Sequence, residues 1–204
     1  MARVFPCPEC HLSTAEVKKW FEAHPDVKDV QYDSATRLAR FEWTGHYKQL
    51  RSLEALLQTE HVSVHIVSPL RLDLQFNPRR GGTFRTADME QALKKIDCLK
   101  VTSFGAGSYE VWMKFDGLRA LDGVGTAADS LGCDLEYRSH DMFRYALSGG
   151  DATTAARAVE IVKGVVFAEV EGSAMRVFAR RNSLTDKRLG AALAPLKLDA
   201  QRQK

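Results

Sequence analysis

Two cysteines near the start of the chain, Cys7 and Cys10, are separated by two residues. A pair of thiolates at this spacing can hold one soft metal ion, such as Cu(I) or Zn(II), from within a single loop. A site with only two ligands from one loop can also release its metal. The first hypothesis from the sequence is therefore a soft-metal site occupied by copper or zinc.

The same residues fit two other metal motifs. The run from Cys7 to His11 matches the Cys-x-x-Cys-His attachment motif of c-type haem, but that attachment takes place outside the cytoplasm. Cys-Pro-x-Cys is also half of a zinc ribbon, which needs a second pair of ligands. Cys98 and Cys133 stand apart in the sequence, and we expect both to be small buried residues.

A redox role is a further alternative. A Cys-x-x-Cys pair ahead of a helix is the arrangement of thioredoxin, where the helix N-terminus lowers a thiol pKa. The order of elements predicted below argues against that fold. The same helix end would, however, favour thiolate over thiol in a metal site, and Phe5 could shield the sulfurs on one side.

The composition limits the classes of function. The chain has 204 residues, of which 45% are hydrophobic and 27% charged, as is typical of a globular protein. Its net charge of +3 is too small for a dedicated nucleic-acid binder. No apolar run is long enough for a membrane span, and none follows Met1 as an export signal. We expect a cytoplasmic protein, whose four cysteines fit a thiol or metal site better than a disulfide framework.

The elements around the cysteine pair form a recognisable order. A strand is predicted over 3–6, and a helix over 13–24 has Ser13 and Glu16 spaced as a capping box. Strands over 27–32 and 37–43 flank a turn, and a helix marked by three leucines precedes a strand over 61–67. In that last strand Val62, Val64 and Ile66 share one face, so His65 is expected to point to solvent. The order is βαββαβ.

This order returns twice, at a period of about 70 residues. The second copy has predicted strands at 70–76, 109–115 and 134–137 and helices at 89–96 and 121–131. In the third copy, helical spacing at 155–162 and 189–196 and alternation at 175–179 repeat the pattern. The prediction is an α+β protein of three tandem ferredoxin-like sandwiches, with antiparallel sheets and helices on one face. The expected domains are 1–68, 69–140 and 141–204, and the expected core includes Phe21, Phe41, Leu93, Val111, Val159 and Val177.

The first copy resembles the heavy-metal-associated (HMA) domain. The resemblance rests on Cys-x-x-Cys between the first strand and first helix of a βαββαβ unit, with Pro25-Asp26-Val27 opening the second strand. It implies that Cys7 and Cys10 bind one soft ion near the surface and pass it to a partner protein by ligand exchange. In this family the loop before the fourth strand comes over the metal, so His61 is a candidate third ligand. An exposed histidine at a strand start is the alternative.

The other two copies lack a thiol pair. The corresponding loop is Asn77-Pro78-Arg79-Arg80-Gly81-Gly82 in the second copy and Gly149-Gly150-Asp151 in the third. The basic loop could hold an anion on backbone N–H groups, although a solvated loop is the default. No nucleophile and base, and no acid and base pair, stand out, so an enzyme is not expected. The two functions in view are a soft-metal carrier and a non-catalytic scaffold or interaction module with a remnant site.

Overall fold

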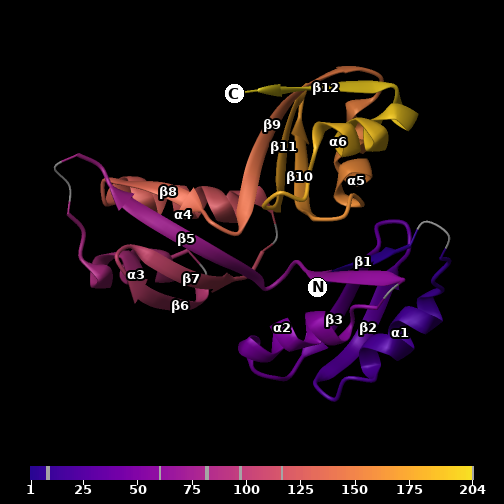
Figure 1. The fold of residues 1–204 in the computed structure, drawn as a ribbon, viewed down its shortest axis with the longest axis horizontal. Helices are drawn as coiled ribbons and strands as arrows, with labels where there is room; N and C mark the ends of the chain where they lie inside the picture. Colours follow the sequence, from indigo (N-terminus) through magenta and orange to yellow (C-terminus); the bar gives the residue numbers. More distant parts are fainter. Residues whose placement is uncertain (8–9, 60, 81–82, 97, 116, 204) are drawn as a thin grey trace. The chain divides into compact units, whose positions relative to one another are not determined.

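The computed structural model describes residues 1–7, 10–59, 61–80, 83–96, 98–115 and 117–203. These residues form three four-stranded antiparallel sheets, each with two α-helices (Figure 1). The predicted class is confirmed: three tandem ferredoxin-like α+β folds. The chain divides into two compact units, Met1–Ser68 and Pro69–Lys204.

The first unit contains one sheet in the order β2-β3-β1-β4. Its elements are β1 (Ala2–Pro6), α1 (Thr14–Glu22), β2 (Val27–Asp33), β3 (Leu38–Trp43), α2 (Tyr47–Leu56) and β4 (Val62–Ile66). Because β1 is central and antiparallel to β4, the end of β1 lies beside the start of β4. The loop that carries the cysteines leaves the sheet at this point.

Helix α1 begins where the sequence predicts. Ser13 Oγ accepts from the backbone N–H of Glu16 at 3.2 Å, and Glu16 Oε2 accepts from the backbone N–H of Ser13 at 2.8 Å. This reciprocal capping box satisfies backbone donors that a helix N-terminus otherwise leaves unpaired. Val17 and Phe21 share one face of this helix and are fully buried. The capping box therefore fixes where the cysteine loop ends.

Side chains of α2 and the segment after it cover the outer edge of β4. Gln58 Nε2 donates to the carbonyl oxygen of Val64 at 2.6 Å, and Glu54 Oε2 accepts from the backbone N–H of Ile66 at 3.4 Å. The expectation that His65 points to solvent is wrong. Its side chain is only 13% exposed, because Glu54 Oε1 lies 3.2 Å from its Nδ1 and Phe5 packs on its ring at 5.1 Å. Covering an edge strand in this way protects it from pairing with another chain.

The second unit contains two sheets, in the orders β6-β7-β5-β8 and β10-β11-β9-β12. The first has β5 (Leu70–Pro78), α3 (Thr86–Lys94), β6 (Cys98–Gly105), β7 (Ser108–Met113), α4 (Leu118–Ser130) and β8 (Cys133–Tyr137). The second has β9 (His140–Gly149), α5 (Ala155–Glu160), β10 (Val165–Glu171), β11 (Ala174–Arg180), α6 (Asp186–Leu193) and β12 (Leu198–Gln203), with short 3-10 turns at Ala152–Thr154 and Ala194–Leu196. Each sheet repeats the topology of the first unit.

Aromatic and ionic contacts join these two sheets. The ring of Phe178 on β11 lies 5.5 Å from the ring of Tyr137 and 6.3 Å from that of Phe115. Arg176 on β11 also pairs with Asp122 of α4 at 3.1 Å. The domain boundary expected at residue 140 lies inside this compact unit and stays a prediction.

The predicted core residues are fully buried except for one. Phe21, Leu93, Val111, Val159 and Val177 have no exposed surface. Phe41 is only half-buried, so its assignment to the core is wrong. It lies on the expected face of β3, with its ring 5.5 Å from that of Phe21, but α1 packs mainly on the neighbouring β2. The sequence thus predicted correctly which face of β3 carries Phe41, but it did not predict how exposed that side chain is.

Candidate metal centre

One backbone hydrogen bond extends the pairing of β1 and β4 into the cysteine loop. Pro6 of β1 pairs with Val62 of β4, and the next N–H along, that of Cys7, donates to the carbonyl oxygen of His61 at 2.6 Å. The ladder between the two strands thus continues for one more rung. As a result, the first cysteine and the histidine are held side by side by the main chain.

Thr59 anchors the other side of this rung. Its Oγ1 accepts from the backbone N–H groups of Val62 at 2.9 Å and of His61 at 3.3 Å, and its own N–H donates to the carbonyl oxygen of Val62 at 2.9 Å. Sequence reasoning missed this residue. A threonine shortly before a strand is a known turn former, and that was the available signal.

The cysteine loop turns back on itself. The backbone N–H of Cys10 donates to the carbonyl oxygen of Cys7 at 3.0 Å, which brings the two side chains together. The predicted help from the helix dipole is weaker than expected, because α1 begins only at Thr14 with Ser13 as its cap. The field of a helix end acts mainly within its first turn. Pro8 and Glu9 lie outside the described residues.

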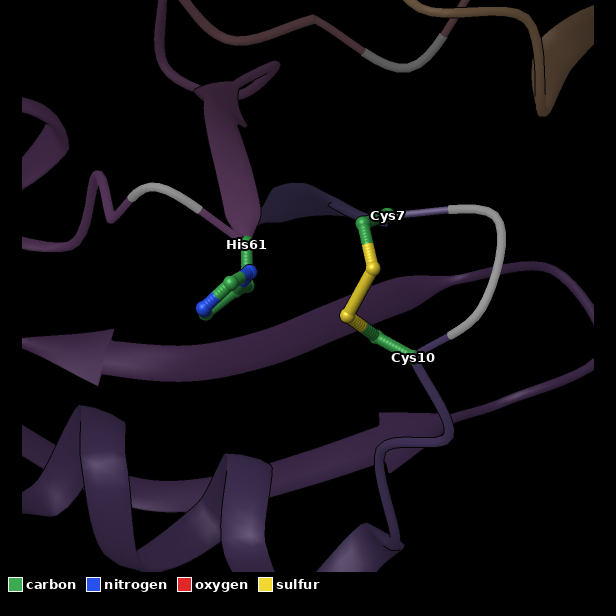
Figure 2. A group of neighbouring side chains, drawn as sticks. All are labelled: Cys7, Cys10 and His61. Carbon is green, nitrogen blue, oxygen red and sulfur yellow. A yellow bond between two sulfur atoms is a disulfide. The ribbon is translucent and has the colours of Figure 1, made fainter.

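Three metal-binding side chains meet here. The sulfurs of Cys7 and Cys10 and a ring nitrogen of His61 lie within 4.8 Å of one another. Both cysteines are half-buried and His61 is exposed. Figure 2 shows the His61 ring beside the two sulfurs, which are joined in a disulfide. The sequence favoured free thiols, so the disulfide is a difference from that expectation, and metal binding by thiolates requires its reduction.

Phe5 and His11 flank the pair differently. Phe5 is 5% exposed and packs on His65, so its ring is fixed two residues before the first cysteine. His11, the axial ligand that a haem motif would need, is exposed. Within the described part of the chain, the only group of three or more metal-binding side chains is Cys7, Cys10 and His61.

The same backbone rung occurs in both sheets of the second unit. The N–H of Arg79 donates to the carbonyl oxygen of Gly132 at 2.9 Å, and the N–H of Gly150 donates to that of Lys197 at 2.9 Å. Arg79 and Gly150 therefore occupy the position that Cys7 holds in the first unit.

In the second copy, an arginine that is paired with two carboxylates occupies that position. Arg79 binds Asp129 of α4 through Nη2 at 2.6 Å and Asp134 of β8 through Nε at 2.8 Å. These hydrogen bonds raise the pKa of the guanidinium above its usual value. Its charge is engaged by two carboxylates, which argues against a role for this arginine in anion binding. Gly81 and Gly82, the rest of that expected anion loop, lie outside the described residues.

In the third copy no side chain fits. A Cβ atom added to Gly150 would lie 2.1 Å from the carbonyl oxygen of Leu196, and one on Gly149 would lie 2.4 Å from that of Lys197. Real Cβ atoms do not approach backbone oxygens so closely. The close approach of the Ala194–Leu196 turn therefore excludes a ligand at this position by sterics alone.

The remaining cysteines differ from each other. Cys133, at the start of β8, is 1% exposed, and its burial raises the pKa of its thiol. Cys98 is only half-buried. The expectation of a small buried residue is therefore confirmed for Cys133 and wrong for Cys98.

Among the described residues, no helix combines the length and the apolar character that crossing a membrane would require.

No protein-family model matches the chain, and no curated protein matches it in sequence. Solved structures similar to it include the N-terminal soluble domains of Bacillus subtilis CopA, at 14% identity over 66% of this chain and 93% of that one, with a TM-score of 0.36. The N-terminal extension of Cupriavidus metallidurans CzcP matches at 16% identity over 54% of this chain and 83% of its own, with a TM-score of 0.25. The three N-terminal RNA-binding domains of the yeast splicing factor Prp24 match at 11% identity over 100% of this chain and 98% of their own, with a TM-score of 0.24. At these scores, function must be argued from the chain's own residues.

Proposed function

We propose that the first unit binds one soft metal ion, Cu(I) or Zn(II), and serves as a non-catalytic, cytoplasmic carrier of that ion. Cys7 and Cys10 are the principal ligands once reduced, and His61 is the third. The single observation that supports this most is that the three donor atoms, from two separate segments, lie within 4.8 Å of one another. The predicted resemblance of this unit to HMA domains supports the same proposal.

These three donors suit a soft metal ion that the protein binds and later releases. Thiolate sulfur selects Cu(I) and Zn(II) over hard cations, and imidazole is a common ligand of both metals. Three protein donors are one short of the four that close a structural zinc site, so a further ligand can enter. In a tetrahedral zinc site the two sulfurs would stand about 3.8 Å apart, given Zn–S bonds of about 2.3 Å. Reduction of the disulfide is what frees them to reach that separation.

Protons should compete with the metal. Each cysteine must be a thiolate and His61 must be neutral to coordinate, so binding releases protons and the apparent affinity should fall as pH decreases.

A second candidate, a docking scaffold, is favoured by one observation. The positions equivalent to Cys7 are an arginine held by two carboxylates and a glycine with no room for a side chain. Two of the three copies thus lack a thiol at this position, and their sheets could serve as docking surfaces for partner proteins.

The test is a titration of fully reduced protein with Cu(I) against a competing chelator. Wild type is compared with the Cys7→Ser/Cys10→Ser variant, and Cys98→Ser serves as the matched control for loss of a thiol. We expect one equivalent of tightly bound metal in wild type and in the control, and loss of that binding in the double variant. Equal affinity in all three proteins would favour the scaffold.

A further inference from the structure

The covalent state of the cysteine pair determines whether the proposed site has any thiolate to offer. The Cα atoms of Cys7 and Cys10 lie 5.1 Å apart across their disulfide. That separation is within the usual range of about 4.4–6.8 Å for bridged cysteines. In the bridged state, His61 is the one member of the donor group that can still coordinate. The same two sulfurs therefore cannot be a disulfide and a metal site at once.

We propose that the first unit is a redox switch, in which the dithiol form takes up the soft metal and the disulfide form releases it, with a small-molecule disulfide of the glutathione type as oxidant. This inference rests on the proposed function and concerns its regulation.

Oxidation of the cysteine pair by glutathione disulfide takes place in two thiol–disulfide exchange steps. One cysteine thiolate attacks a sulfur of glutathione disulfide, forms a mixed disulfide and expels a glutathione thiolate. The other cysteine thiolate then attacks the cysteine sulfur of that mixed disulfide, closes the Cys7–Cys10 bond and expels the second glutathione thiolate. Two electrons pass from the cysteine sulfurs to the S–S bond of the oxidant. The two thiol protons pass through solvent to the two glutathione thiolates, and when metal is bound, the ion leaves in place of those protons.

The structure confines this change to the loop. On one side, the backbone bond from Cys7 to His61 continues the sheet, and on the other the capping box of Ser13 and Glu16 starts α1. Neither interaction uses a sulfur atom. We therefore expect that closing or opening a four-residue ring between them leaves the strand, the helix and their packing unchanged.

The exchange also distinguishes this pair from the buried Cys133. Cys7 and Cys10 are half-buried, so a small disulfide can reach their sulfurs. Cys133 is 1% exposed, and burial raises the pKa of its thiol. Because the thiolate is the nucleophile in exchange, a buried thiol with a raised pKa reacts slowly.

The experiment equilibrates the full chain, without oxygen, in buffers of varied glutathione to glutathione disulfide ratio. Samples are quenched with acid and alkylated, and mass spectrometry counts and locates the free thiols. The series is repeated with Zn(II), a probe that does not itself change redox state, after its Kd for the reduced protein has been measured. Cys98→Ser is the control, with one thiol fewer throughout.

Without Zn(II), we expect two of the four cysteines, Cys7 and Cys10, to lose their alkylatable thiols in one step. With free Zn(II) held at ten times its Kd, the midpoint, expressed as [glutathione]²/[glutathione disulfide], should fall about elevenfold, because metal binds only the reduced form. Cys98→Ser should show the same midpoint and the same displacement.

Two results separate failure of the switch from failure of the proposed function. If oxidised protein binds Zn(II) as tightly as reduced protein, or if bound Zn(II) leaves the midpoint where it was, the switch is overturned and metal binding stands. If reduced protein binds no Zn(II) and no Cu(I), the proposed function fails, and the switch fails with it.

Discussion

Cys7 and His61 are joined by a backbone hydrogen bond of 2.6 Å, from the N–H of the cysteine to the carbonyl oxygen of the histidine. Because this bond continues the ladder between β1 and β4, the position of the histidine beside the sulfurs follows from strand pairing. Equivalent backbone bonds join Arg79 to Gly132 and Gly150 to Lys197, so this hydrogen bond is a feature of the fold in all three copies. Among the described residues, only the first unit places a group of metal-binding side chains beside it.

Replacing His61 with alanine should weaken Zn(II) binding while leaving one equivalent bound by the thiols. Even groups that only support a ligand are worth about 10- to 100-fold in metal affinity, so a loss of at least about tenfold is expected. Competition titration measures it, with His11→Ala as the matched control, because His11 is exposed and lies outside the donor group. Equal losses in the two variants would remove His61 from the site.

Truncating Phe21 should destabilise the first unit far more than truncating Phe41. Phe21 has no exposed surface, and Phe→Ala at such sites costs about 3–5 kcal/mol. Phe41 is half-buried and leaves a partly solvated gap, so a smaller loss is expected. Chemical denaturation of the two variants, followed by a probe in the first unit, gives the comparison. A larger loss for Phe41→Ala would mean that the depth assigned to the two rings is reversed.

Gly150→Ala should destabilise the second unit, because the added methyl group meets the carbonyl oxygen of Leu196. Overpacking of this kind costs about 1–3 kcal/mol. Gly125→Ala in α4 is the control, since a Cβ there meets nothing within 4 Å. In a helix interior that change should stabilise by about 0.5–1 kcal/mol. The thermal unfolding midpoint should therefore fall for Gly150→Ala and rise for Gly125→Ala. An unchanged midpoint for Gly150→Ala would show that the Ala194–Leu196 turn can move to accommodate the methyl group.

The second unit should lose stability in alkali. Burial and the nearby charge of Asp186 raise the pKa of Tyr145 to about 12, and burial likewise raises the pKa of Tyr137. In an unfolded chain a tyrosine ionises near pH 10. The folded state thus holds protons that the unfolded state has lost, so its stability is full below about pH 10 and declines as pH rises towards 12.

Denaturation across that range measures the effect. Tyr145→Phe should flatten the decline, although it removes the hydrogen bond from the hydroxyl to Asp186 at 3.2 Å. A stability curve that falls equally steeply in wild type and in Tyr145→Phe would mean that other groups cause the alkaline loss.

Periodicity predicted every element of the first copy and all but β6 of the second. The apolar spacing before Pro25 and the pairing of Ser13 with Glu16 predicted α1, and alternating valines predicted β4. The last strand, Leu198–Gln203, was not predicted, because its sequence LDAQRQ is mostly polar. It lies at the edge of its sheet, where only one neighbour pairs with it, and solvent-facing side chains are tolerated there.

The sequence singled out Cys7, Cys10 and His61, which the structure brings together, but it did not predict the disulfide between the two cysteines. Residue type and spacing were sufficient for Cys7 and Cys10, and His61 followed from a resemblance. The burial of His65 depends on Glu54 reaching from α2 to the edge of β4, a tertiary contact that strand alternation does not encode. The disulfide could not be predicted either, since spacing alone is the same for a dithiol and for a bridge.

X-ray absorption at the zinc edge of the reduced chain, loaded with one equivalent of Zn(II), identifies the atoms that bind the metal. We expect two sulfur neighbours at about 2.3 Å and a nitrogen neighbour at about 2.0–2.1 Å that carries the signature of imidazole. In the His61→Ala variant the sulfur pair should remain and the imidazole signal should disappear. A coordination shell of oxygen and nitrogen alone, with no sulfur in the wild type, would contradict the assignment of Cys7 and Cys10 as the metal ligands.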